Sequence, residues 1–253
     1  MKYGLKLWST DDEELFKEAI ELVGRKEIDF MELYIVPNSF VLEESEKIKS
    51  LKNIPTVIHA PHMEHGFDVS SLDDAKIEIF KSQVIGTADF LNSKFIVVHA
   101  ALGTQEDFER NIKKINDPRI LIENMPKVGL EDEACFAYSY EQLRLIKDSG
   151  FDLCLDFSHA IKSALAQGTD YKDFVEKLIF DLKPAYFHIC NGKVTILKDE
   201  HRDLFDGDFD IKWIKNALMK FDKEREVYLT SETPKGGKGL ENDLKNINYF
   251  RAL

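Results

Sequence analysis

Short apolar runs alternate with amphipathic stretches along the whole chain. Val, Ile, Leu and Phe dominate the runs, as expected of strands that are buried on both faces of a sheet. In the stretches between them, apolar residues recur at the three- and four-residue spacing of a helix with one buried face. We therefore predict strands at residues 3–8, 30–36, 55–61, 93–101, 119–126, 151–160, 184–190 and 226–234.

A predicted helix follows each predicted strand, and the helices fall at residues 11–26, 42–51, 71–92, 106–116, 139–150, 171–182, 210–221 and 240–250. Strand–helix units in such a series favour parallel strands joined by right-handed crossovers, which close into a single (β/α)8 TIM barrel. A doubly wound open sheet is the alternative α/β arrangement. No Gly-, Ser- or Pro-rich linker interrupts the series, so we predict one domain over residues 1–253.

Length and composition are those of a globular chain. The 253 residues match the roughly 250 residues of such a barrel, and a hydrophobic fraction of 43% excludes general disorder. No apolar run approaches the ~20 residues that cross a bilayer. The first residues include acidic ones where a signal peptide is apolar, so we expect a soluble cytoplasmic protein with no membrane partner.

Cysteine use and charge narrow the possibilities further. Cys135, Cys154 and Cys190 show no CxxC spacing, and we expect buried free thiols rather than a disulfide framework. The formal net charge of −12 argues against nucleic acid as a partner, because proteins that bind it generally present a basic surface. The charge does not exclude nucleic acid, since a metal cluster carries its own positive field.

All seven histidines lie in or beside the apolar runs. Carboxylates stand inside the same kind of run, where an unpaired charged group or imidazole is costly to bury. His159 and His201 are expected in loops just beyond predicted strands. The residues at the carboxyl ends of the third to eighth predicted strands are His59, His99, Glu123, Asp156, His188 and Glu232.

In a barrel of this kind the carboxyl ends of the strands meet at one mouth, where active sites are built. Residues that are far apart in the sequence therefore converge there without a local motif. A mixture of imidazole and carboxylate without thiolate suits Zn²⁺ or Mn²⁺. We expect one to three such ions, with ligands only from the third predicted strand onward. For any single histidine, the alternative is an ordinary hydrogen-bonded core residue.

The series HAPH, VVHA, IENMP, LDFSHA, FHICNG, KDEH and SETP resembles the endonuclease IV/xylose isomerase-like TIM-barrel superfamily, in order and over essentially the whole chain. Each motif is short, and their order and spacing carry the resemblance. The segment NG-(x)₅-KDEH also resembles uncharacterised sugar phosphate isomerase/epimerase members of that superfamily.

The two branches of the superfamily imply different metal centres. The sugar-isomerase branch implies one metal on Glu123, Asp156, His188 and Glu232, with Glu123 and Glu232 flanking the substrate as the acid–base pair. The endonuclease IV branch implies three metals, with ligands at His59, His99, Glu123, Asp156, His159, His188, Asp199, His201 and Glu232.

The chain departs from the endonucleases where they contact DNA. The loop after the third predicted strand has His62 and His65 in place of their aromatic residue and amide, and residues 35–40 lack their basic, polar loop. These departures put DNA binding in doubt and leave the metal chemistry intact. We expect His62 to bind substrate and His65 to be a solvated loop residue. For His62 the alternatives are an extra metal ligand or a solvated loop residue, and for His65 they are an extra metal ligand or a substrate contact.

A Gly- and Lys-rich turn follows the eighth predicted strand, at residues 233–243. Phosphate sites in these barrels are frequently formed after the seventh and eighth strands, near a helix N-terminus. Lys235 and Lys238 are accordingly candidates for binding a substrate phosphate, and an ordinary surface turn is the alternative.

These observations favour a metal-dependent isomerase or epimerase that acts on a sugar or sugar phosphate through an enediolate. The first alternative is an endonuclease IV-like phosphodiesterase (an AP endonuclease), and the second is a metal-binding barrel without catalysis. The sequence carries no indication of the oligomeric state.

Overall fold

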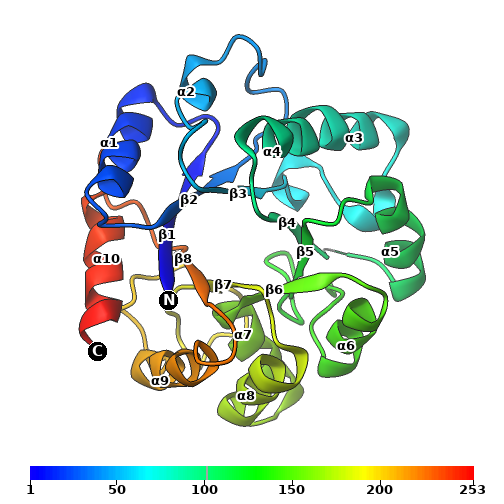
Figure 1. Cartoon of the computed structure of the whole chain (residues 1–253). Helices are drawn as coiled ribbons and strands as arrows, with labels where there is room; N and C mark the ends of the chain where they lie inside the picture. The colour runs from blue at the N-terminus through cyan, green and yellow to red at the C-terminus, as the bar shows by residue number, and fades with distance from the viewer. Residues whose placement is uncertain (101) are drawn as a thin grey trace.

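Eight parallel strands close into a barrel in chain order in the computed structural model, which describes residues 1–100 and 102–253 (Figure 1). The first strand pairs with both the second and the eighth, with Gly4 beside Phe30 and Leu5 beside Ser231. The open-sheet alternative is therefore wrong, and the barrel is confirmed. The strands are β1 (Lys2–Trp8), β2 (Phe30–Tyr34), β3 (Thr56–His59), β4 (Ile96–His99), β5 (Ile120–Glu123), β6 (Asp152–Asp156), β7 (Tyr186–Ile189) and β8 (Tyr228–Ser231). The predicted strand 93–101 ends at residue 101, which lies outside the described residues.

Helices surround the barrel and bury their apolar faces against it (Figure 1). None of the described helices combines the length and apolar character of a membrane span. Side-chain caps such as Asp12, Thr104 and Ser139 fix where several of the helices begin. The helices are α1 (Glu13–Gly24), α2 (Glu46–Lys49), α3 (Asp74–Ile79), α4 (Gly86–Leu91), α5 (Gln105–Ile112), α6 (Tyr140–Asp148), α7 (Phe157–Gln167), α8 (Tyr171–Leu182), α9 (Ile211–Phe221) and α10 (Glu241–Ala252).

The segment around α7 corrects one prediction. The strand predicted over residues 151–160 ends at Asp156, and α7 begins at the next residue. The Asp156 carboxylate caps this helix by accepting the backbone N–H of His159 at 2.6 Å. His159 thus lies in the first turn of a helix and not in a loop. The apolar run continues from strand into helix, which hid the boundary in the sequence.

Two layers of inward-facing side chains fill the barrel. Strand residues two positions apart point to the same face, so each of β2 to β7 contributes one residue to each layer. The lower layer consists of Phe30, Val57, Val97, Leu121, Cys154 and Tyr186. Two residues further along the same strands, the upper layer consists of Glu32, His59, His99, Glu123, Asp156 and His188.

The lower layer is apolar, apart from the Tyr186 hydroxyl, and tightly packed. The Phe30 ring lies 5.8 Å from the Tyr186 ring and leaves no room for a side chain on β1, because a Cβ atom at Gly4 would come within 2.3 Å of it. Cys154 is buried within this layer, and Cys135 and Cys190 are buried elsewhere. All three are free thiols, as the sequence predicts.

Candidate metal centre

The upper layer opens at the mouth formed by the carboxyl ends of the strands. His59, His99, Glu123 and Asp156 are the last residues of β3 to β6. His188 is the second-last residue of β7, and Glu232 directly follows β8. The structure thus confirms the predicted placement of all these residues at strand ends.

The nine predicted ligands form three groups, in each of which one candidate ligand atom per residue lies within 4.8 Å of the others. Glu123 belongs to two groups and joins them. Their role as metal ligands stays a prediction, but the structure brings all of them together. The groups are His59, His99 and Glu123; Glu123, Asp156, His188 and Glu232; and His159, Asp199 and His201.

In the first group, two imidazole nitrogens face one carboxylate oxygen. Nε2 of His59 lies 3.3 Å and Nε2 of His99 lies 3.1 Å from Oε2 of Glu123. Nδ1 of His59 lies 2.7 Å from the Ala60 carbonyl oxygen. Since a carbonyl oxygen only accepts, Nδ1 carries the proton and the Nε2 lone pair faces Glu123.

In the second group, His188 is oriented from behind. Its Nε2–H donates to Oε2 of Glu32 at 2.8 Å. Nδ1 is thereby directed at the group, 3.1 Å from Oε1 of Glu123 and 3.3 Å from Oε1 of Glu232. A ring nitrogen held by a carboxylate, with the other nitrogen facing a donor set, is the usual arrangement of metal-binding histidines.

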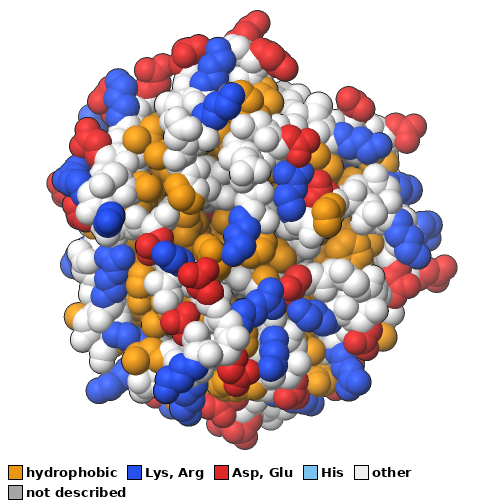
Figure 2. Space-filling view, viewed as in Figure 1, with side chains coloured by type: hydrophobic (Ala, Val, Ile, Leu, Met, Phe, Trp, Pro, Cys, Tyr) orange, Lys and Arg blue, Asp and Glu red, His pale blue; other side chains and the backbone are white. Residues whose placement is uncertain are grey.

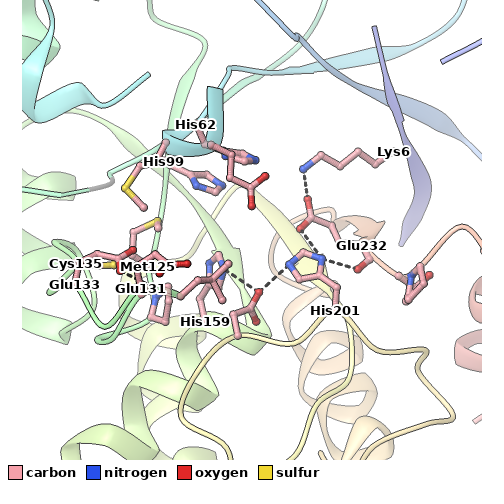
Figure 3. Close-up of a pocket in the computed structure, with 18 of the residues that line it drawn as sticks. Lys6, His62, His99, Met125, Glu131, Glu133, Cys135, His159, His201 and Glu232 are labelled. Carbon is pink, nitrogen blue, oxygen red and sulfur yellow. Dashed lines mark hydrogen bonds and ion pairs between the residues drawn. The ribbon is translucent and has the colours of Figure 1, made fainter. Parts of the chain in front are cut away.

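The third group is assembled from α7 and the loop between β7 and α9. Nδ1–H of His159 donates to the Asn124 carbonyl at 2.8 Å, and Nδ1–H of His201 donates to the Glu232 carbonyl at 2.9 Å. The Nε2 atoms of these two rings lie 3.6 Å and 2.8 Å from Oδ2 of Asp199. Figure 3 shows His159 and His201 converging on this carboxylate.

The donor atoms fit divalent cations. Within residues 1–100 and 102–253, Nε2 of His59, Oε2 of Glu123 and Oδ2 of Asp156 are buried and have no hydrogen-bond donor. Buried acceptors that face one another are unfavourable unless a proton or cation lies between them. Imidazole and carboxylate donors without thiolate suit Zn²⁺ or Mn²⁺.

In the metal-free site, burial and neighbouring charges shift the pKa values of adjacent residues in opposite directions. Burial would raise the pKa of Glu123, but His99 and His188 hold it well below its ordinary value. Burial raises the pKa of Asp156 to about 6, with Glu123 adding to the rise while His159 opposes it. Burial would lower the pKa of His201, but Asp199 raises it to about 9. Protons thus occupy part of the space that cations would fill.

Two charged residues of the site, Lys6 and Glu32, were missed in the sequence. Nζ of Lys6 lies 2.5 Å from Oε1 of Glu232 (Figure 3). It also lies 3.5 Å from Oε1 of Glu32. Oε2 of Glu32 also accepts the Tyr186 hydroxyl at 2.7 Å. The prediction that ligands come only from the third strand onward stays a prediction, although Glu32 on β2 belongs to a further set of possible ligands with His59, His188 and Glu232. The available signal was a charged residue inside each of the apolar runs KYGLKLW and FMELYIV.

A pocket of about 770 Å³ lies over the metal centre. One part of its wall is apolar and includes Trp8, Met63, Met125 and Leu130. His62 also lines the pocket and stacks on His99, with ring centroids 5.1 Å apart. This placement is compatible with the predicted contact between His62 and substrate.

His65 is not a freely solvated loop residue. Its Nδ1 accepts the Tyr34 hydroxyl at 2.8 Å, and the same hydroxyl accepts the backbone N–H of His62 at 3.1 Å. The His65 ring also meets Trp8 edge to face, at 5.6 Å between centroids. His65 therefore holds the pocket wall in place through Tyr34.

The two lysines predicted to bind phosphate differ in position. Lys235 lines the pocket, and its Nζ donates to the Lys6 carbonyl and, at 2.8 Å, to Oδ1 of the buried Asp243. Lys238 is exposed, outside the pocket lining. Only Lys235 is near enough to the centre to contact a bound substrate, and its ammonium is already compensated by Asp243.

Comparison with known proteins agrees with this architecture. The family model described as xylose isomerase-like TIM barrel matches residues 18–252. No curated protein matches the chain. Endonuclease IV from Thermus thermophilus is similar in structure, with a TM-score of 0.70 and 20% identity over 100% of this chain and 98% of that one.

Two further solved structures have the same fold. The 3-keto-D-glucoside 4-epimerase from E. coli superposes with a TM-score of 0.69 and 12% identity, with 100% of both chains covered. An AP endonuclease of family 2 from Brucella melitensis gives 0.67 and 16%, over 100% of this chain and 99% of that one. At these identities the likeness concerns the fold alone.

Proposed function

Because the chain belongs to the xylose isomerase-like TIM-barrel family, whose solved structural relatives include epimerases and endonucleases, we propose that it is a metal-dependent enzyme, and specifically a hydrolase of a small phosphoester. The observation that supports this most is the convergence of nine ligand-type residues in three groups, two of which share Glu123. One metal is enough for an enediolate reaction, whereas clustered metals are typical of phosphoester hydrolysis.

The charge of the site favours the same conclusion. The carboxylates of Glu123, Asp156, Asp199 and Glu232 carry four negative charges. A single divalent cation would leave the centre negative and repel a phosphoryl group. Three divalent cations exceed the four negative charges by two, and the positive charge of Lys6 offsets the further negative charge of Glu32. A filled centre therefore attracts a phosphate oxygen.

Divalent cations bound by these groups would supply a Lewis acid for the phosphoryl oxygens and a water of lowered pKa as the nucleophile. The protein's own residues then position and shield the substrate. Lys6 offers its ammonium to a phosphoryl oxygen at the edge of the centre. Trp8, Met63 and Met125 form an apolar wall for the leaving group and exclude water from that side.

A small substrate fits better than a nucleic acid duplex. The pocket volume lies within the roughly 300–1,000 Å³ of small-molecule sites. Glu64, Glu131 and Glu133 line its wall, where they oppose a polyanion. Acidic and basic side chains are also mixed on the face drawn in Figure 2, which shows no histidine and therefore does not include the mouth of the metal centre.

The sugar isomerase or epimerase, which the sequence alone favours, becomes the second candidate here, and one observation supports it. Oε1 of Glu123 and Oε1 of Glu232 lie 3.1 Å and 3.3 Å from the same nitrogen, Nδ1 of His188. The two glutamates therefore belong to one group of possible metal ligands. One metal on that group would leave the two glutamates beside a chelated sugar, where they would act as base and acid. The ion pair between Glu232 and Lys6 opposes this role, because it keeps the carboxylate ionised and engaged.

The decisive experiment measures metal content and reaction class on the same protein. Zinc or manganese is counted by elemental analysis after reconstitution. Hydrolysis of bis(p-nitrophenyl) phosphate and nicking of an abasic-site duplex are then followed, together with deuterium uptake from D₂O into a panel of sugars and sugar phosphates. We expect three ions, turnover of the small diester, little nicking and no deuterium uptake.

Matched variants separate the outcomes. Glu123→Gln should lose both metal and hydrolysis, whereas Glu64→Gln on the pocket wall should keep its metal content. One bound ion with deuterium uptake that Glu232→Gln abolishes would support the isomerase instead. Efficient nicking of the duplex would identify an AP endonuclease, and metal without any of these activities would identify a binding barrel.

A further inference from the structure

Lys162 is a fully buried lysine outside the nine predicted ligands and the pocket wall. It lies on α7 with 0% of its surface exposed. Burying an ammonium group is expensive unless hydrogen-bond acceptors surround it. An apolar side chain would fill the same buried position, so packing alone does not explain why a charged residue stands there.

The ammonium of Lys162 gathers one short segment of the loop between β7 and α9. Nζ donates to the carbonyls of Lys193 at 2.8 Å and Ile196 at 2.7 Å, and to Oε2 of Glu200 at 2.9 Å. The same Glu200 oxygen accepts the backbone N–H of Lys193 at 3.0 Å. Both ends of the segment 193–200 are thus tied to a single nitrogen atom.

The tied segment positions two of the three ligands in the third group. Asp199 directly precedes Glu200, and His201 directly follows it. The remaining ligand, His159, lies on α7 three residues before Lys162, so the two side chains lie on one side of the helix about one turn apart. One helix therefore supplies both a ligand and the group that fixes the loop facing that ligand.

Other contacts hold the base of the loop independently. The Asn191 amide donates to the Leu204 carbonyl at 2.8 Å, and its oxygen accepts the backbone N–H of Gly192 at 2.9 Å and of Phe209 at 3.0 Å. These bonds lie outside the segment 193–200. Loss of the Lys162 ammonium should therefore loosen this segment and leave the barrel and the loop base folded.

We infer that Lys162 is a positioning residue for the third ligand group: its buried ammonium fixes the segment 193–200 so that Asp199 and His201 meet His159. The inference rests on the proposed function, because the third group is needed for a three-metal centre and not for a centre with one metal. Its structural content can be tested without metal or substrate.

The test replaces Lys162 by Met, which keeps the apolar stem and removes the three donors. In the metal-free protein, amide hydrogen exchange of residues 193–201 should become at least about ten-fold faster, while the strands keep their protection. After reconstitution, the count of zinc ions should fall from three to two, because only the third group is loosened. In Lys162→Ala, added methylammonium should restore slow exchange by filling the vacated site.

Lys172→Met is the matched control. Lys172 is also a helix lysine, and it pairs at 2.5 Å with Asp210, which ends the loop between β7 and α9, but its side chain is 38% exposed. This substitution should change neither readout. If Lys162→Met does not fold, Glu200→Gln weakens the same tie from the loop side. Unchanged exchange of residues 193–201 in the folded variant would overturn the inference. Fewer than three ions in the wild-type protein would instead overturn the proposed function, and exchange would still decide the role of Lys162.

Discussion

The two layers inside the barrel share six strands and do opposite things. Phe30, Leu121 and Tyr186 of the lower layer are apolar or aromatic and fill the barrel floor. Two residues further along their strands, Glu32, Glu123 and His188 are charged or titratable and equally buried. Residues two positions apart on the same strand thus serve different purposes: the first packs the barrel interior, and the second belongs to the candidate metal centre.

This difference shows what the upper layer lacks. The lower layer is complete in itself, because aromatic and aliphatic groups need only contact. The upper layer has buried acceptors on His59, Glu123 and Asp156 without a donor among the described residues. It is therefore complete only with added cations or protons. Tyr186 links the layers, because its ring packs below while its hydroxyl donates to Glu32.

The largest expected effect is on the upper layer. Glu123→Gln removes the carboxylate shared by two ligand groups, so we expect loss of at least one metal ion and a fall in turnover of about a thousand-fold or more, equivalent to about 4 kcal/mol. Elemental analysis and steady-state kinetics measure the two effects. Full metal content with unchanged turnover would contradict the assignment of Glu123.

The lower layer should respond in the opposite way. Phe30→Ala removes a buried ring that packs against Tyr186 and Tyr228, and we expect the free energy of unfolding to fall by about 3–5 kcal/mol. Denaturant unfolding of the metal-free protein measures the change. The folded variant should still bind as many ions as the wild type. A loss of metal comparable to that of Glu123→Gln would show that the layers are not separable.

Glu32→Gln tests the junction between the layers. Glu32 fixes the ring of His188 through Nε2, so its replacement should lower metal affinity by about 10- to 100-fold, as outer-sphere substitutions do at other metal sites. Competition with a chromogenic chelator measures the affinity. Tyr186→Phe is the milder comparison, because it removes one donor to Glu32 and leaves the contact with His188. Equal affinity in wild type and Glu32→Gln would remove Glu32 from the site.

The sequence was sufficient for the barrel and for the position of the strand-end residues, because both follow from regular spacing, whereas the nine-residue ligand set is implied only by the resemblance and stays a prediction. Strand-end residues such as His99 and Glu123 stand at the carboxyl boundary of apolar runs, and parallel strands bring those boundaries together. Glu32 and Lys6 carry the same signal, since each lies two residues beyond Phe30 or Gly4 on its strand. They were missed because their strands end two residues later, at Trp8 and Tyr34, so neither stands at a boundary.

Other features had no periodic signal at all. Helix α7 follows β6 without an intervening loop, and its cap, Asp156, is also a strand-end residue. Lys162 lies between the predicted strand 151–160 and the predicted helix 171–182, and nothing in the sequence marks it as buried, because its burial depends on a loop that folds over it from thirty or more residues away. Such tertiary contacts are set by packing and not by local pattern.

The smallest expected effect is on pH dependence, and it should be confined to the metal centre above the lower layer. In the metal-free protein Asp199 raises the pKa of His201 to about 9 against the effect of burial. A protonated His201 therefore stabilises the fold below its ordinary pKa of about 6.5, and this contribution is lost as the pH rises through about 9. Metal binding has the opposite dependence, because a cation must displace that proton.

Zinc affinity of the third group should accordingly rise between pH 6 and 9, while the melting temperature of the metal-free protein falls towards pH 9. His201→Asn should reduce both slopes, and Phe30→Ala, although less stable, should keep them. A zinc affinity that is flat over this range in the wild type would mean that no proton is displaced from His201. The metal centre would then differ from the lower layer in polarity alone, and not in the exchange of protons for cations that its unpaired acceptors predict.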